Sequence, residues 1–383
     1  MMRRKEYCLI ILSILTFILF SVSSDAIEQF KVRVIYFQPT DAPAQPDNLQ
    51  DIMRQTQEFY GVQMELYKYG FKTFDYEEDG DGDIVIHAIK GNHKIQHYAA
   101  KTYQEMIKEI PFEFRSENVN SQDTAHIFIV GGLHLVDNVA LGIGWAITSW
   151  RTGGNAVIAG NQLNVSIVAH ELGHAFGLYH TDVPNALMGP GNDILLDYET
   201  RWLDRHHFFN DTHIRTDIPE FLVYVGAKRI SAFKILFKAV VRSNSGLYHV
   251  QMCRNAGAFA IGSSPLEGNS DVAEIEVSRH WLKNGDDVWF QIMDINGNHI
   301  VKDIRNITIP EKEHDPNPVI INKNPENIPA DDLITIEKED EGETPEIKPC
   351  PNCLPNDEEK QDNNLAIHPK GKLTTQWARL KLR

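Results

Sequence analysis

Residues 168–180 read VAHELGHAFGLYH and contain the pattern H-E-x-x-H-x-x-G-x-x-H. His170 and His174 stand four positions apart, so on an α-helix both side chains project from one face and can reach one ion. Glu171 projects to the neighbouring side of the helix. Its carboxylate can there take a proton from a water molecule without ligating the ion. The stretch therefore predicts a metal-binding helix.

The turn after this helix supplies a third candidate ligand. Gly177 stands where the helix should end, since glycine adopts positive φ without a Cβ penalty. That turn brings His180 towards the first two histidines. Three neutral imidazoles leave a fourth position open for water, which is typical of a catalytic zinc site and not of a closed structural one. The sequence predicts one catalytic Zn²⁺, with Glu171 as general base.

Residues 1–26 have the pattern of a secretory signal peptide. Residues 1–5 are MMRRK, an apolar run covers residues 8–20, and Ser24-Asp25-Ala26 is a plausible cleavage site. The apolar run is shorter than the roughly 20 residues that span a bilayer. We expect a secreted, extracellular protein with no membrane contact after cleavage; an uncleaved signal anchor is the alternative.

The negative charge is concentrated near the C-terminus. The net charge is −16, and residues 311–362 alone hold 16 acidic and 5 basic residues, a balance of −11. We expect an acidic, Pro-rich disordered tail at 310–369, followed by a basic segment at 370–383. The tail contains Cys350 and Cys353, for which a local disulfide or idle thiols are favoured over a redox or metal role. No basic stripe favours a nucleic-acid partner.

Strand and helix patterns alternate between residues 31 and 209. Strands are expected at 31–37, 73–76, 84–89, 125–130, 141–147 and 155–160, and helices at 47–69, 98–110, from Asn161 or Asn164 to Gly177, and at 194–209. The helix at 98–110 should end before Pro111. The strand at 141–147 is a candidate exposed edge, with which a peptide could pair in extended form.

An acidic loop, EEDGDGD, covers residues 77–83. Asp79, Asp81 and Asp83 alternate with glycines as in the first half of a calcium loop, but the glutamate that should complete such a loop is missing. Asp-Gly also favours a hairpin turn. We expect a hairpin there, and Ca²⁺ bound by these aspartates is the less favoured alternative.

Residues 220–309 contain short β-type runs separated by turn residues. The clearest runs are 232–237, 247–252, 273–277, 288–292 and 299–301. Five to seven strands at this spacing predict a small antiparallel sandwich. No catalytic constellation is apparent in it. Its role is left open between binding a substrate, binding a surface partner and stabilising the chain.

A second motif follows the third histidine: residues 186–189 read ALMG. The extended histidine motif followed so soon by this methionine resembles the metzincin clan of zinc endopeptidases. The short His-to-Met spacing is similar to that of matrixins, without matching one named family. The resemblance implies that Met188 forms the Met-turn, an apolar floor beneath the three imidazoles. It also implies that residues 181–187 line the pocket for the residue after the scissile bond.

We therefore expect an α+β fold. Residues 27–215 would form a metzincin-like catalytic domain with a twisted, mostly parallel sheet, an edge strand and a long active-site helix. An all-β sandwich would follow at 220–309. The expected function is that of a secreted zinc endopeptidase acting on protein or peptide substrates. The alternatives are a catalytically inactive binding or adhesion protein, and another zinc hydrolase such as an exopeptidase or amidase.

Overall fold

The computed structural model describes residues 30–101, 103–116, 124–133, 142–146, 154–191, 193–210, 218–254 and 259–310. These residues all lie in one compact unit, residues 1–351. The expected signal peptide and everything from residue 311 onward, with Cys350 and Cys353, lie outside the described residues. Within the described part, no helix combines the length and the apolar character needed to cross a membrane.

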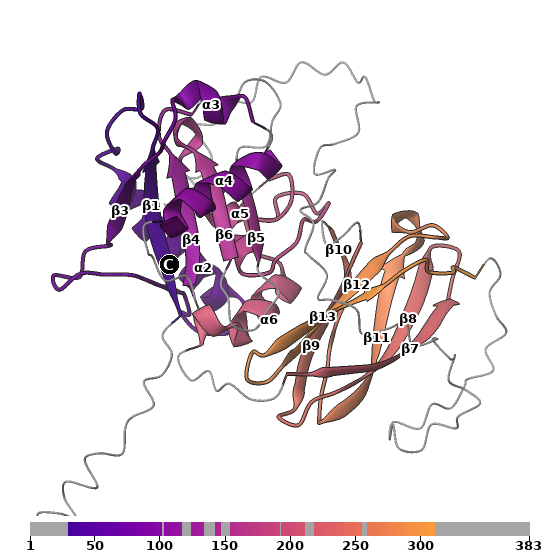
Figure 1. Cartoon of the computed structure of the whole chain (residues 1–383). Coiled ribbons are helices and arrows are strands. Elements are labelled where there is room, and N and C mark those ends of the chain that lie inside the picture. The colour runs from indigo at the N-terminus through magenta and orange to yellow at the C-terminus, as the bar shows by residue number, and fades with distance from the viewer. Residues whose placement is uncertain are drawn as a thin grey trace, which may run out of the picture. The chain divides into compact units, whose positions relative to one another are not determined.

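The N-terminal part alternates strands and helices, and the C-terminal part contains strands (Figure 1). The first part consists of β1 (Lys31–Gln38), α2 (Leu49–Leu66), β2 (Asp75–Tyr76), β3 (Ile86–Lys90), α3 (Ile95–Ala99), α4 (Tyr103–Ser116), β4 (Thr124–Val130), β5 (Gly142–Ala146), β6 (Gly154–Ala159), η1 (Gly160–Gln162), α5 (Val165–Ala175), α6 (Asp197–Arg205) and η2 (His207–Phe209). The second consists of β7 (Glu220–Arg229), β8 (Lys234–Arg242), β9 (Leu247–Arg254), β10 (Phe259–Pro265), β11 (Ser270–Ser278), η3 (Arg279–Trp281), β12 (Val288–Asp294) and β13 (His299–Ile304).

One mixed sheet organises the N-terminal part. Its strands follow the order β2-β1-β4-β6-β5, and β3 also pairs with β1. The pairs of β1 with β2, β3 and β4, and of β4 with β6, are parallel, whereas β5 runs antiparallel to β6. This arrangement confirms the expected mostly parallel sheet. The expected edge strand is β5, which stands at the end of the sheet order.

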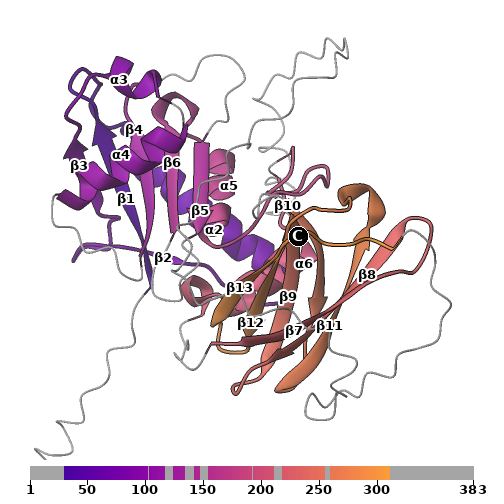
Figure 2. The same cartoon turned by 45° about the vertical axis from the view of Figure 1, so that its right-hand side comes forward.

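Helices cover both faces of this sheet (Figures 1 and 2). On one face Ile35, Phe37 and Phe128 form a buried cluster with Tyr98 of α3 and Met106 of α4. The opposite face carries α2 and α5. Alternate strand residues point to opposite faces, so each central strand buries side chains on both sides. The seven residues of β4 are accordingly all buried.

The approach of α5 to the sheet depends on a glycine. A Cβ on Gly154 of β6 would collide with the backbone of Ala175 in α5. From the other side, the Tyr60 hydroxyl of α2 donates a hydrogen bond to the Ala169 carbonyl of α5 at 2.7 Å. The central helix is therefore fixed between the sheet and α2.

The helix expected at 98–110 was wrong in its limits. The structure has α3 at Ile95–Ala99 and α4 at Tyr103–Ser116, so Pro111 lies inside α4. A proline within a helix removes one backbone donor and normally disfavours the helix. Contacts on both sides of it outweigh this cost. Ile110 is fully buried, and the Glu113 carboxylate accepts hydrogen bonds from the Asn92 N–H and the Tyr98 hydroxyl.

The acidic loop makes a tight turn between β2 and β3. Glu78 forms an antiparallel bridge with Ile84, and the Asp79 N–H donates to the Asp83 carbonyl at 2.9 Å. The Asp79 carboxylate accepts the N–H groups of Asp81 and Asp83. These hydrogen bonds account for the turn, as the Asp-Gly pattern predicts. Calcium binding at this loop stays a hypothesis.

The C-terminal part packs two antiparallel sheets face to face. Their strand orders are β10-β9-β12-β13 and β11-β8-β7. One buried cluster contains side chains of both sheets. Among them are Phe237 of β8 and Ile275 of β11 from the three-stranded sheet, and Val250, Met252 and Phe290 from the four-stranded sheet. Within residues 218–310, as far as they are described, the strands number seven, as the sandwich pattern predicts.

A buried carboxyl group stands at the start of α6. Glu199 is fully buried, and its Oε2 accepts the Leu196 N–H at 2.7 Å. Burial raises the pKa of Glu199 to about 7 from 4.5, although this hydrogen bond acts in the opposite direction. The folded protein therefore keeps a proton on Glu199 at a pH where the unfolded chain has released it.

We expect Glu199 to lower the free energy of unfolding as the pH rises from 4.5 to about 7, because a raised folded-state pKa stabilises only below that window. Glu199→Gln keeps an oxygen for the Leu196 N–H but cannot ionise. Between about pH 4 and about pH 8, the free energy of unfolding of Glu199→Gln should rise relative to that of wild type by on the order of 3 kcal/mol. Urea unfolding at both pH values measures this. Asp197→Asn, whose side chain is 69% exposed, is the control. If the free energy of unfolding changes equally with pH in Glu199→Gln and in wild type, the pKa of Glu199 is not raised by folding.

Candidate metal centre

The central helix begins at a capped residue. The Asn164 side chain accepts the Ile167 N–H at 3.1 Å, which satisfies one of the free donors at the N-terminus of α5. Of the two asparagines considered as caps from the sequence, the structure selects this one. The helix then runs to Ala175, and its regular backbone places His170 and His174 one turn apart on the same side.

The structure brings the three motif histidines together. Nε2 of His180 lies 3.3 Å from Nε2 of His170 and 3.0 Å from Nε2 of His174. A tetrahedral Zn²⁺ with bonds of about 2.0–2.1 Å sets its nitrogen ligands about 3.4 Å apart. The three ligand atoms therefore have the spacing that a metal ion requires, and this cluster could hold one.

Two backbone carbonyl groups orient these rings. His170 Nδ1 lies 2.7 Å from the Leu187 carbonyl, and His174 Nδ1 lies 2.9 Å from the Leu178 carbonyl. A carbonyl oxygen only accepts, so each Nδ1 carries the proton and each Nε2 presents a lone pair. Burial, followed by the neighbouring His180 and His170, lowers the pKa of His174 well below its usual value, so this imidazole is neutral.

The chemistry of this donor set fits a cation. Each neutral imidazole can offer one lone pair from Nε2, and the contacts of 3.0 and 3.3 Å between these atoms would let one positive ion bind all three. Zinc is the ion that neutral imidazoles in this number and spacing favour. The residues present therefore fit the group that the sequence predicts.

Glu171 lies on α5 directly beside the first histidine. Its side chain is only 5% exposed. Low exposure strengthens the electrostatic effect of a carboxylate on a nearby polarised group. Its position in α5, between the two helical histidines, agrees with the sequence expectation. Its role as general base stays a proposal.

A glycine turn ends the helix and redirects the chain, as expected. Gly177 has φ +83°, a conformation that side chains with a Cβ disfavour. The Leu178 N–H returns to the Gly173 carbonyl at 2.9 Å, which is the bond of a Schellman cap. The Trp202 indole Nε1 of α6 donates to the Phe176 carbonyl at 2.9 Å and holds the turn from outside.

Met188 lies on a loop that returns to the same helix. It is fully buried, and its carbonyl accepts the Thr181 N–H at 2.9 Å. A Cβ on Gly173 would lie 2.6 Å from the Met188 sulfur, so the helix presents a glycine where this methionine packs. The neighbouring Leu187 carbonyl is the one that orients His170. Whether Met188 acts as the floor of the site is part of the proposal below.

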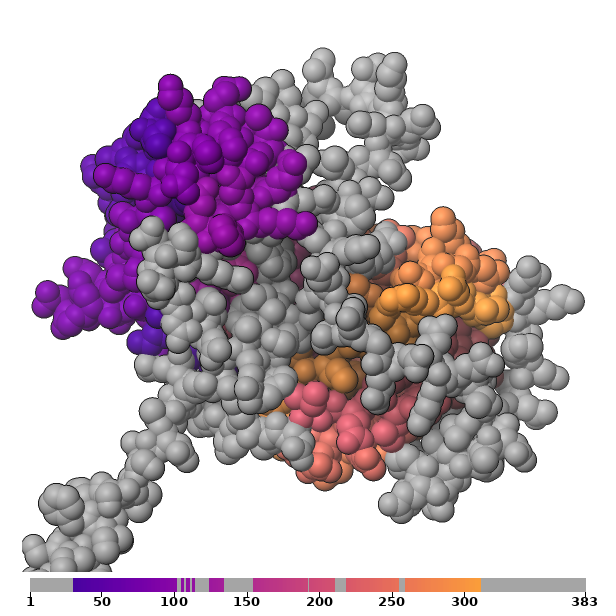
Figure 3. Space-filling model, in the orientation of Figure 1, coloured from indigo at the N-terminus to yellow at the C-terminus, as the bar shows by residue number. Residues whose placement is uncertain are grey.

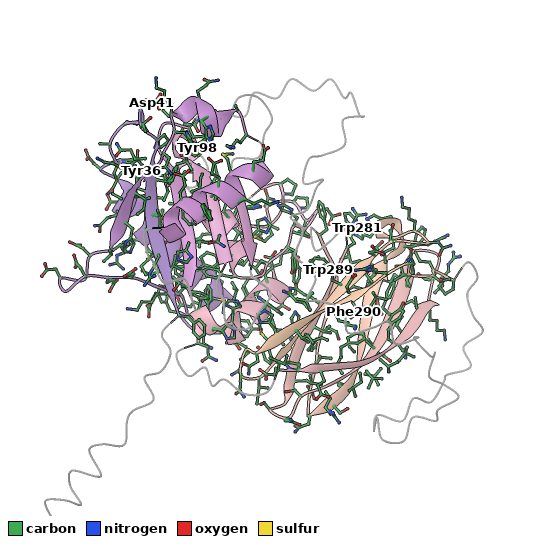
Figure 4. All side chains as sticks on the ribbon, viewed as in Figure 1. Tyr36, Asp41, Tyr98, Trp281, Trp289 and Phe290 are labelled. Carbon is green, nitrogen blue, oxygen red and sulfur yellow. The ribbon has the colours of Figure 1, made fainter. Side chains whose placement is uncertain are left out.

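The C-terminal sandwich contacts the third histidine, a contact that no pattern in the sequence indicates. The Ala260 N–H of β10 donates to the His180 carbonyl at 2.9 Å, and His180 forms a parallel bridge with Phe259. The Phe259 ring lies 5.6 Å from the His180 ring, centroid to centroid. Behind it, the Arg254 guanidinium stacks over the rings of Phe259 and Trp281; Trp281 is labelled in Figure 4.

Two buried glutamines of the sandwich hold the turn before that histidine. Gln251 of β9 and Gln291 of β12 stand opposite each other in register and are hydrogen-bonded. Gln251 Nε2 donates to the Gly177 carbonyl at 3.4 Å, and Gln291 Nε2 donates to the Tyr179 hydroxyl at 3.2 Å. The segment that carries His180 therefore lies against the sandwich along its length.

Comparisons with known proteins agree with this geometry. Residues 50–201 match the family model described as matrixin, a range that includes the whole histidine motif and Met188. No curated protein matches the sequence. Among solved structures, the chain is similar to catalytically inactive OgpA from Akkermansia muciniphila in complex with the O-glycopeptide substrate glycodrosocin. The TM-score is 0.52 at 19% identity, over 72% of this chain and 92% of that one.

Wild-type OgpA gives a TM-score of 0.51 at 20% identity, over 72% of this chain and 91% of that one. Metalloproteinase-II from Bacteroides fragilis matches with a TM-score of 0.32 at 14% identity, over 46% and 53%. The likeness to OgpA covers more of the chain than residues 50–201, so it extends beyond the part that is similar to matrixins. The expected resemblance to metzincins and the expected fold class are confirmed, and a zinc metallopeptidase-like function is supported.

We expect Phe259→Ala to weaken zinc binding by roughly 10-fold, because groups that orient a metal ligand contribute about 10–100-fold to affinity. Competition between the protein and a chromogenic chelator measures the dissociation constant. Phe233→Ala removes a sandwich phenylalanine that is 78% exposed and serves as the matched control. An unchanged zinc affinity in Phe259→Ala would show that this ring does not support His180.

Proposed function

We propose that this protein is a secreted zinc-dependent endopeptidase. The observation that carries the proposal is the convergence of the Nε2 atoms of His170, His174 and His180, with the two Nδ1 atoms of the helical pair turned to carbonyl groups. His170, His174 and His180 would hold the ion. Three nitrogen ligands leave room for a water molecule and a substrate carbonyl, as hydrolysis requires.

When bound, Zn²⁺ acts as a Lewis acid that polarises a carbonyl group and lowers the pKa of a water molecule to about 7. Glu171 would take the proton from that water as it attacks the scissile carbonyl, and would then deliver it to the leaving amine. The low exposure of the Glu171 side chain excludes bulk water from this transfer. Met188 would support the imidazoles from the side of the helix where Gly173 leaves space.

An extended substrate would pair with β5. This strand ends the sheet order and runs antiparallel to β6, and the last turn of α5 packs close to the neighbouring β6 at Gly154. Backbone hydrogen bonds to a free sheet edge bind a peptide largely independently of its side chains. This favours cleavage within a chain over removal of a terminal residue.

The proposal of secretion rests on the signal-peptide pattern of residues 1–26. The accessory sandwich would serve first as a support for His180, through Phe259 and Ala260. A further binding role of its outer surface stays open.

The test compares a variant of the proposed general base, Glu171, with a variant of a proposed zinc ligand, His174. Glu171→Gln keeps the size of the side chain but removes the base, so peptide hydrolysis should fall by about 100-fold or more while zinc content stays at the wild-type level. His174→Ala should lose both. A peptide library digest read by mass spectrometry measures hydrolysis, and metal analysis measures zinc. Wild-type rates in Glu171→Gln would contradict the mechanism.

The same digest separates the alternatives. Cleavage of internal bonds in a denatured protein identifies an endopeptidase, whereas release of terminal residues alone identifies an exopeptidase. A wild-type protein that binds zinc but cleaves nothing would be a binding protein. Because OgpA forms a complex with an O-glycopeptide substrate, the library should contain an O-glycosylated peptide beside its unglycosylated form.

A further inference from the structure

A second group of metal-ligating side chains lies on the α3–α4 side of the sheet. His93 precedes α3, His97 lies within it, and Glu109 lies on α4. One ligand atom from each residue lies within 4.8 Å of the other two. His97 Nε2 is 2.7 Å and His93 Nε2 is 3.9 Å from the same carboxylate oxygen, Glu109 Oε1. The two imidazole rings stack with centroids 3.8 Å apart.

The backbone around these histidines is held in place. The His93 carbonyl accepts the Thr40 N–H at 2.9 Å, and the His93 N–H donates to the Tyr98 hydroxyl at 3.3 Å. The Asp41 carboxylate accepts the Ile95 N–H at 2.7 Å, at the start of α3. Figure 4 labels Tyr98 and Asp41 beside this helix, and Figure 3 shows the α3–α4 region at the surface. The backbone that carries the two imidazoles is therefore held by hydrogen bonds of its own.

The two carboxylate oxygens of Glu109 contact different kinds of partner. Glu109 Oε2 faces the Lys101 ammonium at 2.8 Å, while Oε1 faces the imidazoles. A carboxylate that lies between an ammonium group and two imidazoles offers the oxygen ligand that a divalent cation can share with the histidines.

An ordinary ion pair explains only part of this arrangement. A protonated His97 would satisfy Glu109 by itself and would need no second imidazole. His93 nevertheless stacks on His97 and turns its Nε2 towards the same oxygen, with a side chain that is 49% exposed. Two imidazoles and one carboxylate are a donor set that zinc and neighbouring divalent transition metals bind.

We propose that His93, His97 and Glu109 form a second divalent transition-metal site, which joins α3 to α4. The site shares no residue with the cluster on α5, and it lies on the opposite face of the sheet. Its half-exposed histidine leaves coordination positions for water. The ion would act as a cross-link, since it ties residues from two helices that pack on the sheet.

The test uses the full chain and Zn²⁺ alone, with bound zinc counted after equilibrium dialysis. Wild type should bind two equivalents, His174→Ala one, and His174→Ala combined with His93→Ala none. His93→Ala is decisive because it removes a ligand but keeps the ion pair between His97 and Glu109. Its exposed position leaves the fold intact, which circular dichroism checks. His87→Ala is the control, since His87, whose side chain is 26% exposed, pairs with Glu77 at 2.9 Å but belongs to neither histidine cluster found among the described residues.

Zinc should also raise the midpoint of thermal unfolding of His174→Ala, and this shift should vanish in the double variant. The proposal is overturned if His174→Ala binds no zinc, or if His93→Ala binds as much zinc as wild type. Either result would identify the cluster as an ion pair. Peptide hydrolysis by zinc-loaded His93→Ala should match wild type, because this residue lies outside the proposed active site.

Discussion

Three imidazole nitrogens face one point, and the rest of the N-terminal part serves to keep them there. The constraint is set on the other side of the rings, where Nδ1 of His170 and His174 donates to two backbone carbonyl groups. These bonds fix which nitrogen carries the proton, and so they fix where the lone pairs point. The arrangement therefore places three imidazole nitrogens at the spacing that one cation would require.

The two helical histidines and the third histidine are held by different sets of contacts. The helical pair is fixed by a capped, buried helix that glycines allow to approach both the sheet and Met188. The third histidine lies beyond the helix, on a turn that Trp202, Gln251 and Gln291 hold from outside. A loop alone would leave His180 free to move, and the cost of ordering it would reduce metal affinity. The contacts with the sandwich order His180 in the folded protein, so metal binding would not have to order it.

Local features of the site could be predicted from the sequence, and long-range ones could not. Four-residue spacing, the asparagine cap and the glycine turn each depend on a few neighbouring residues. The contact between His180 and Phe259 joins positions far apart in the chain, so no periodicity indicates it. Gln251 shows why: strand alternation places it away from the sandwich core and suggests solvent, yet it is fully buried against Gly177. The prediction that a helix ends before Pro111 was wrong for the same reason, because tertiary contacts outweigh the local preference of proline.

The parallel bridge between residues 180 and 259 makes the segment after the glycine turn a short additional rung on the sheet of β10. Residues 50–201, which match the matrixin family model, include His180, so this part of the chain shares a backbone pairing with the sandwich. The two halves are therefore linked at one of the three clustered histidines. Because β10 is hydrogen-bonded to the backbone of His180, a displacement of β10 would also move the residue that carries the third imidazole.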